Sequence, residues 1–220
     1  MKPVWICEIG INHQGNMDKA FRMINKAKEC GADYAKFQFY DPAKVLGTKH
    51  EAFAYACNCY LSKYQHETLK RHCDSVGIKY MVSVFDIKDV AWAASISQAM
   101  KIATRMNKRQ DFIAAVANTK LPVFMSVQPE LTIKREYQKR FELLWCVAKY
   151  PSTKEDLAGY PYRGFGLSSH CPDPCATLDA WKNGARVIEN HLCEAKDELG
   201  CDISSSLDFQ DYKALIKACK

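Results

Sequence analysis

The chain alternates short apolar runs with longer stretches in which apolar residues recur every three or four positions. A run such as Tyr34–Phe39 is typical of a buried strand, because it is continuous, short and rich in aromatic residues. Residues 16–30 place their apolar side chains at helical spacing, and Gly31 follows as a stop signal. The two patterns take turns along the whole length of the chain.

This alternation predicts eight strands and about eight helices. The strands are expected at residues 4–9, 34–39, 79–84, 99–102, 123–125, 143–147, 165–167 and 187–191. The helices are expected at residues 16–30, 65–76, 90–95, 109–118, 133–139, 175–183 and 209–219, with short helical or loop segments near 52–59 and 151–159. Strand–helix units without a long Gly-, Ser- or Pro-rich linker favour an α/β (β/α)8 TIM barrel over a doubly wound sheet. We expect residues 1–220 to form a single domain.

In a TIM barrel the active site lies at the carboxyl ends of the strands. The expected ends carry lysines, hydroxyls, amides, acids and two histidines. The candidates are Glu8, Asn12, Lys36, Gln38, Ser83, Lys101, Thr104, Ser126, Tyr150, Ser168, His170, His191 and Asp202. Alternation points Lys36 and Lys101 into the barrel, where an ammonium group is costly unless it meets an anion. With Ser83, Ser126 and Ser168 they predict a cradle for a phosphate and a carboxylate; the alternative is that both lysines reach water at the strand ends.

Two of the apolar runs end in a histidine. Residues 164–170 end at His170 and residues 187–191 end at His191, with a helix-length segment between them. Strand, helix and strand of this length form one right-handed βαβ unit, so both histidines emerge at the same end of adjacent parallel strands. Two imidazoles at one rim can bind one divalent cation. The alternative is two unrelated histidines that end buried strands.

Composition narrows the classes of function. The 220 residues contain 48% hydrophobic and 25% charged residues, which is ordinary for a globular chain. No apolar run approaches membrane-spanning length, and the first acid comes too early for a secretory signal, so we expect a cytoplasmic protein without a membrane partner. A net charge of +6 and a pI near 8.7, without a dense basic patch, argue against nucleic acid and fit a small anionic substrate. The eleven cysteines lack a disulfide or zinc framework.

Four motifs, in order and at fitting intervals, carry a family resemblance. They are Ile-Cys-Glu-Ile-Gly-Ile-Asn-His-Gln-Gly at 6–15, Ala-Lys-Phe-Gln at 35–38, Gly-Leu-Ser-Ser-His at 166–170 and Ile-Glu-Asn-His at 188–191. Together they resemble the barrel domain of the N-acetylneuraminate (sialic acid) synthase family. The resemblance covers essentially the whole chain, and the opening motif is the most specific.

The resemblance implies a transferase that condenses phosphoenolpyruvate with an N-acyl-mannosamine-type aldose to a 2-keto-3-deoxy sugar acid and releases phosphate. His170 and His191 match the family's ligands for a divalent metal, usually Mn2+, with Mg2+ or Co2+ as alternatives, which acts as a Lewis acid on the sugar aldehyde. Positions that bind phosphoenolpyruvate match Lys36, Ser83, Lys101, Thr104, Ser126 and Ser168. Positions that handle the sugar match Glu8, Tyr150 and Asp202. The resemblance leaves a homodimer open.

The chain departs from the family pattern at three positions and at its end. Met106 stands where the family has a glutamate that is a candidate for activating water, and a thioether cannot accept a proton. Ala148 replaces an asparagine that helps bind phosphoenolpyruvate, and Ser169 replaces an aspartate beside the metal histidine. The sequence stops at Lys220, where the family continues into an antifreeze-like domain.

Three functions stay open. An active or residually active synthase is favoured by the retained histidines, lysines and Glu8. A catalytically impaired barrel that serves as a ligand-binding or partner subunit is favoured by Met106 and Ala148. A related barrel aldolase would form a Schiff base at Lys36 or Lys101. The identity of the sugar acceptor is not encoded in any motif that we recognise.

Overall fold

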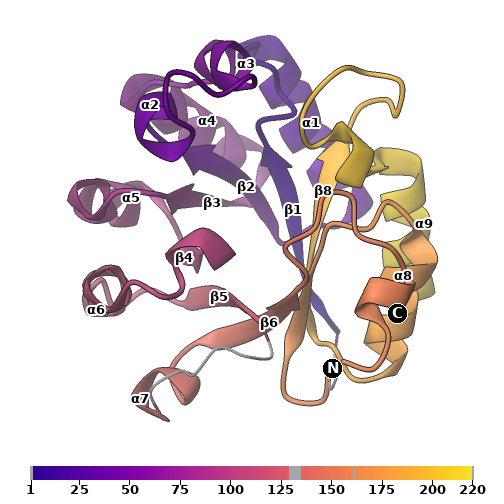
Figure 1. Ribbon diagram of the computed structural model, residues 1–220. Helices are drawn as coiled ribbons and strands as arrows, with labels where there is room; N and C mark the ends of the chain where they lie inside the picture. Colours follow the sequence, from indigo (N-terminus) through magenta and orange to yellow (C-terminus); the bar gives the residue numbers. More distant parts are fainter. Residues whose placement is uncertain (1, 129–134, 161, 220) are drawn as a thin grey trace.

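The computed structural model describes residues 2–128, 135–160 and 162–219, which form a closed barrel with helices around it (Figure 1). Eight parallel strands each pair with the next along the chain, and β8 pairs with β1 to close the barrel. The strands are β1 (Val4–Gly10), β2 (Tyr34–Phe39), β3 (Lys79–Val84), β4 (Ala99–Ile102), β5 (Val123–Val127), β6 (Glu142–Cys146), β7 (Gly166–Ser169) and β8 (Val187–Cys193). The predicted (β/α)8 TIM barrel is confirmed.

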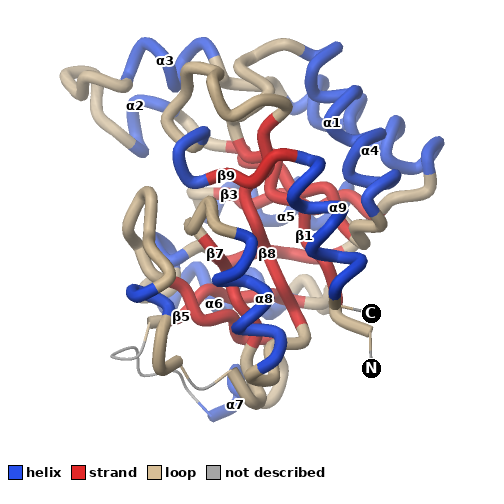
Figure 2. The backbone as a smooth tube through the Cα atoms, turned by 90° about the vertical axis from the view of Figure 1, so that its right-hand side faces the viewer, coloured by secondary structure: helices blue, strands red, loops and turns tan. Residues whose placement is uncertain are grey.

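Helices connect the strands on the outside of the barrel. They are α1 (Met17–Cys30), α4 (Lys63–Val76), α5 (Val90–Ile96), α6 (Gln110–Asn118), α7 (Arg135–Gln138), α8 (Pro174–Lys182) and α9 (Phe209–Ala218). Figure 2 shows α8 and α9 side by side on the outside of β8, and α9 also contacts α1. Within the described part of the chain, no helix is long and apolar enough to cross a membrane.

Capping residues set the helix boundaries that periodicity leaves uncertain. Asn16 lies just before α1, and its side chain accepts a hydrogen bond from the backbone N–H of Lys19. α4 begins two residues earlier than predicted, because Ser62 and Gln65 form a capping box at its start. Of the helix predicted over 133–139, the structure shows α7, and residues 133 and 134 lie outside the described residues.

Several short elements lie in the loops at the carboxyl ends of the strands. The long loop after β2 contains two short helices, α2 (Pro42–Val45) and α3 (Phe53–Asn58). Four 3-10 turns are described, η1 (Ile87–Asp89), η2 (Thr104–Met106), η3 (Glu155–Leu157) and η4 (Ile203–Ser205). A short strand, β9 (Ser206–Asp208), pairs with β8 beyond the closed barrel. These segments surround the rim at which the predicted site residues lie.

The inside of the barrel is built in layers. The lower layer is apolar, and its members are Ile6, Tyr34, Met81, Ala99, Phe124, Leu144 and Val187. On β7 the corresponding position is Gly166, where a Cβ atom would lie 2.4 Å from the carbonyl oxygen of Val187. Since strand residues alternate in direction, the residue two positions further along each strand faces inward again.

The next layer is polar on every strand. Its members are Glu8, Lys36, Ser83, Lys101, Ser126, Cys146, Ser168 and Glu189, and all eight are buried. We call this set the polar ring. An apolar layer below and loops above thus enclose a layer of two ammonium groups, two carboxylates, three hydroxyls and a thiol.

Candidate active site

One carboxylate in the polar ring is shared by two lysines. Glu189 Oε1 lies 3.2 Å from Lys101 Nζ, and Glu189 Oε2 lies 3.9 Å from Lys36 Nζ. Ser168 Oγ donates a hydrogen bond to Glu189 Oε1 at 2.9 Å. Burial alone would raise the pKa of Glu189, but the ammonium groups of Lys101 and Lys36 outweigh burial and lower it. Glu189 is therefore ionised at neutral pH.

Lys36 has a second carboxylate partner, Glu8, on the neighbouring strand. Lys36 Nζ lies 2.7 Å from Glu8 Oε2, and Gln38 Nε2 donates to Glu8 Oε1 at 2.8 Å. Burial alone would lower the pKa of Lys36, whereas Glu189 and Glu8 raise it. The inward direction predicted for this lysine is confirmed, and the anions that it meets in this structure are protein carboxylates.

The remaining predicted phosphoenolpyruvate contacts lie on the following strands. Lys101 Nζ donates to Ser126 Oγ at 2.8 Å, which joins Ser126 to Glu189 through one ammonium group. Ser83 stands between Gln38 and Lys101 in strand register, and its buried Oγ has no hydrogen-bond partner among the described residues. Thr104 begins η2 at the rim. A lysine has three N–H donors, so Lys101 keeps one for a ligand anion.

The two predicted metal ligands meet at the rim above the polar ring. The ring centroids of His170 and His191 are 5.3 Å apart, and the Tyr150 ring stacks on His170 at 3.9 Å. His170 Nδ1 donates to the carbonyl oxygen of Val147 at 2.7 Å, which leaves Nε2 free. Burial, with a smaller contribution from His191, lowers the pKa of His170 to about 3. His170 is therefore neutral, the form that a metal ion binds.

Asp202 approaches the same rim from the loop after β8. Its Oδ2 lies 3.5 Å from His191 Nδ1, a nitrogen that makes no hydrogen bond within the described residues. A Cβ atom at Gly10 would lie 3.2 Å from Gln38 Nε2, 3.3 Å from Glu8 Oε1 and 3.5 Å from Asp202 Oδ2. Since Gly10 also has a φ of +55°, a glycine here lets two of the predicted sugar-side residues, Glu8 and Asp202, gather with Gln38 at one point.

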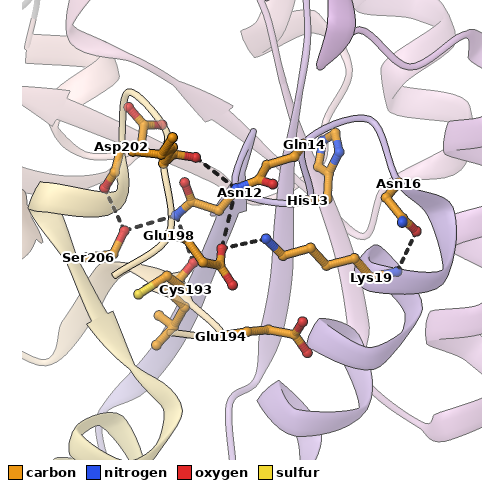
Figure 3. Close-up of polar contacts among 12 residues, drawn as sticks. Asn12, His13, Gln14, Asn16, Lys19, Cys193, Glu194, Glu198, Asp202 and Ser206 are labelled. Carbon is orange, nitrogen blue, oxygen red and sulfur yellow. Dashed lines mark hydrogen bonds and ion pairs between the residues drawn. The ribbon is translucent and has the colours of Figure 1, made fainter. Parts of the chain in front are cut away.

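Asn12 uses both of its amide N–H groups within the protein (Figure 3). Its Nδ2 donates to the carbonyl oxygen of Leu192 at 2.8 Å and to Ser206 Oγ at 2.9 Å. Ser206 Oγ in turn donates to the backbone carbonyl of Asp202 at 2.7 Å. Only Asn12 Oδ1 lacks a partner among the described residues. Asn12 thus ties the end of β8 to the loop that carries Asp202, and its contact with a substrate stays a prediction.

The donor atoms fit a divalent cation as a partial set. The imidazoles of His170 and His191 supply two nitrogen ligands of the type that Mn2+ and related metals accept. Among the described residues, no group of three or more His, Cys, Asp and Glu side chains has the arrangement of a metal site.

Glu189 and Cys146 belong to the polar ring although the strand-end pattern does not single them out. Each lies two positions after an inward apolar residue, Val187 or Leu144, so strand alternation is the signal that identifies both. Burial raises the pKa of the Cys146 thiol to about 11, which keeps it protonated. All eleven cysteines are free thiols.

The departures from the family pattern have visible consequences. The side chain of Met106, which is 4% exposed, packs in the apolar core between strands and helices rather than in the polar ring. Ser169 Oγ accepts a hydrogen bond from the backbone N–H of Cys171. Ala148 is exposed beyond the end of β6. None of the three supplies a carboxylate or an amide at the rim.

A pocket of about 580 Å3 lies beside this centre, not in it. Its lining includes Phe39, Tyr60, Lys63 and Asp89, and no member of the polar ring. Phe39 packs against Trp92 with ring centroids 4.6 Å apart, and Lys63 pairs with Asp89 at 2.9 Å. The pocket therefore lies over the apolar side chains outside the barrel strands. The groups suited to acid, base and cation chemistry lie in the polar ring and at the rim that carries His170 and His191.

Sequence comparisons show the family to which the chain belongs. A family profile described as the NeuB family matches residues 23–220. The chain belongs to the NeuB family. N-acetylneuraminate-9-phosphate synthase of Homo sapiens is 29% identical over 98% of this chain and 68% of its own length. Pseudaminic acid synthase of Campylobacter jejuni is 28% identical over 98% of this chain and 72% of its own length.

Solved structures of NeuB relatives have the same fold. N-acetylneuraminic acid synthetase of Leptospira borgpetersenii, in complex with citrate, superposes with a TM-score of 0.90 at 25% identity, over 100% of this chain and 83% of that one. Spore coat polysaccharide biosynthesis protein SpsE of Bacillus subtilis superposes with a TM-score of 0.83 at 27% identity, over 99% of this chain and 67% of that one. The resemblance read from the motifs is confirmed at the level of family and fold.

Proposed function

We propose that this NeuB-family chain condenses phosphoenolpyruvate with an N-acyl-mannosamine-type aldose and uses a divalent metal, with Mn2+ as the first choice. The products would be a 2-keto-3-deoxy sugar acid and inorganic phosphate. The observation that carries the proposal is the polar ring, with two buried ammonium groups below the paired rings of His170 and His191. Two relatives of this chain are named as synthases of N-acetylneuraminate 9-phosphate and of pseudaminic acid.

Phosphoenolpyruvate fits the side of the ring that holds Lys36, Lys101, Ser126 and Ser168. Its carboxylate and phosphate need cationic and hydroxyl donors, and these residues offer both. In the structure the two lysines are already balanced by Glu8 and Glu189, so the charged groups of the ring cancel. We therefore expect phosphoenolpyruvate to bind more tightly when a divalent cation, or a proton on one carboxylate, adds positive charge.

The sugar fits the side formed by Glu8, Gln38, Asp202 and Tyr150. A cation held by His170 and His191 would supply Lewis-acid polarisation of the aldehyde oxygen. C3 of phosphoenolpyruvate then forms the new bond to the aldehyde carbon, water adds at C2, and phosphate leaves from the resulting tetrahedral carbon. Glu8, which accepts a hydrogen bond from Gln38, would accept the proton of that water, since Met106 cannot.

The test is phosphate release from phosphoenolpyruvate by the purified protein. We expect release only when Mn2+ and an N-acylhexosamine, or its 6-phosphate, are both present, and its loss on addition of EDTA. His191→Gln should remove the activity, whereas His50→Gln, at an exposed loop position, should leave it unchanged. No phosphate release across a panel of such sugars, with metal bound, would rule the proposal out.

A second candidate is a ligand-binding subunit that does not turn over. The packing of Met106 in the apolar core favours it, because the position of the expected water-activating carboxylate is filled by a thioether. This candidate predicts binding of Mn2+ or phosphoenolpyruvate in calorimetry together with no phosphate release. Turnover in the assay above excludes it.

A Schiff-base aldolase is disfavoured by the surroundings of Lys36. Glu189 and Glu8 raise the pKa of Lys36 and keep its amine protonated, and a protonated amine is not a nucleophile. Lys101 is likewise engaged by Glu189 and Ser126. We expect borohydride with a keto acid to label neither lysine.

A further inference from the structure

The loop that brings Asp202 to the rim has no regular structure of its own. It covers residues 194–202, between β8 and η4, and its tip, Leu199, is 88% exposed. A loop with little buried apolar surface is placed mainly by its polar contacts. The anchors of this loop therefore decide where Asp202 lies relative to His191.

The middle of the loop is anchored to the beginning of α1 (Figure 3). Lys19 Nζ lies 2.5 Å from Glu198 Oε2, and the two side chains are 9% and 22% exposed. Gln14 Nε2 donates to the carbonyl oxygen of Leu199 at 2.8 Å. An ammonium group withdrawn from water is costly without a partner, so Lys19 strongly favours the loop position that keeps Glu198 beside it.

The last residues of the loop are fixed from two other directions. Ser206, held by Asn12, donates to the backbone carbonyl of Asp202. At Gly200 a Cβ atom would lie only 2.6 Å from the hydroxyl oxygen of Tyr55 in α3, so the backbone there packs directly against that ring. With Glu198 held on one side and Asp202 on the other, only residues 199–201 lie between the two anchored points.

We propose that Lys19 and Glu198 are a positioning pair for Asp202. They set the place of its carboxylate beside His191 and thereby control binding of the sugar acceptor, without touching a substrate themselves. The effect on the sugar acceptor rests on the proposed function, in which Asp202 belongs to the side of the site that binds the sugar. The phosphoenolpyruvate side is built from Lys36 and Lys101 on other strands, so it should be insensitive to the pair.

The kinetic test separates the two substrates. Lys19→Met should lower kcat/KM for the acceptor by about 10-fold or more, because misplacing a contact by about 1 Å can cost up to about 100-fold, while KM for phosphoenolpyruvate changes less than about twofold. Lys19→Arg should keep most of the wild-type kcat/KM for the acceptor, since it keeps the positive charge. The matched control is Arg22→Met. Arg22 also joins α1 to this loop, at 3.0 Å from Glu194, but it is 55% exposed and its partner directly follows β8.

A second measurement does not depend on activity. In the protein without substrates, amide hydrogen exchange of residues 194–202 should be about 10-fold faster in Lys19→Met than in the wild type, and unchanged in Arg22→Met. Equal exchange in all three proteins, or an equal loss for both substrates, would overturn the positioning role. If the wild type turns over no acceptor, the proposed function and the effect on the sugar acceptor fail together, and exchange alone decides whether the pair places the loop.

Discussion

Glu189 is the residue on which the electrostatic balance of the barrel interior depends. Its carboxylate accepts from Ser168 and lies within ion-pair distance of Lys36 and Lys101. Without it, two ammonium groups would share a buried space with one remaining carboxylate, Glu8. Like charges repel strongly where water cannot screen them, so the carboxylate is needed to hold the two lysine side chains in place side by side.

Replacing that carboxylate by a neutral amide should be costly. We expect Glu189→Gln to lower the free energy of unfolding by about 3–5 kcal/mol, the usual loss when one partner of a buried ion pair is removed. The side chain keeps its shape, so the loss would report the charge and not the packing. Urea denaturation at pH 7.5 measures it.

Ser168→Ala is the matched control for this substitution. It removes one hydrogen bond to the same charged carboxylate without changing a charge, and it should cost about 1.5–3 kcal/mol. If Glu189→Gln costs no more than Ser168→Ala, the two lysines do not need Glu189 as an ion-pair partner.

At the residue scale, the direction of strand side chains could be predicted and their partners could not. Alternation correctly turns Lys36 and Lys101 inward, and the same rule identifies Glu189 once the apolar layer below it is known. The stacking of Tyr150 on His170 depends on loop conformation, which periodicity does not describe. Likewise, nothing in the opening motif indicates that the amide of Asn12 is directed at β8 and Ser206.

At the scale of elements, the rim depends on close contact between loops that are distant in the chain. Gly15 ends the turn after β1 with a φ of +76°, and a Cβ atom there would lie 2.1 Å from the backbone oxygen of Asn58 in α3. Asn58 Nδ2 donates back to the carbonyl oxygen of Gln14. The β1 and β2 loops therefore meet backbone to backbone at this glycine.

Gly15→Ala should consequently destabilise the protein more than its backbone angle alone explains. Gly47 provides the comparison, because its φ of +81° is similar and nothing lies within 4 Å of its Cβ position. We expect Gly47→Ala to cost about 1–2 kcal/mol for the left-handed conformation, and Gly15→Ala a further 1–3 kcal/mol for the clash. Thermal and urea unfolding of both variants, at one pH, give the difference. Equal losses would mean that the two loops separate without cost.

Elements with a full hydrophobic period could be predicted, and the shortest ones could not. The 14 residues of α1 and of α4 each cover almost four turns and show their apolar face in the sequence. α2 has four residues and β9 has three, too few for a period to be recognised. Both depend on their surroundings, α2 on its cap at Asp41 and β9 on pairing with β8.

At the scale of the whole molecule, buried histidines link stability to pH. Burial lowers the pKa of His13 to about 4 and that of His66 to about 3, with Lys19 and His13 respectively acting in the same direction. Their ordinary value is 6.5. Between pH 6.5 and about 4 the unfolded chain therefore binds two protons that the folded chain does not, and His170 adds a third when no metal is present.

Stability should thus fall as the pH falls through this window. Each such histidine contributes about 1.4 kcal/mol per pH unit, so the metal-free protein should lose at least about 3 kcal/mol per unit below pH 6.5 and show little change between pH 7 and 8. Urea unfolding in EDTA at several pH values measures the slope. His66→Gln should reduce the slope by about 1.4 kcal/mol per pH unit relative to the wild type. A stability that stays flat from pH 7 to 5 would show that water reaches these rings in the folded state. In that case the packing of His66 against Tyr80 and of His13 against Phe37 would not persist in solution.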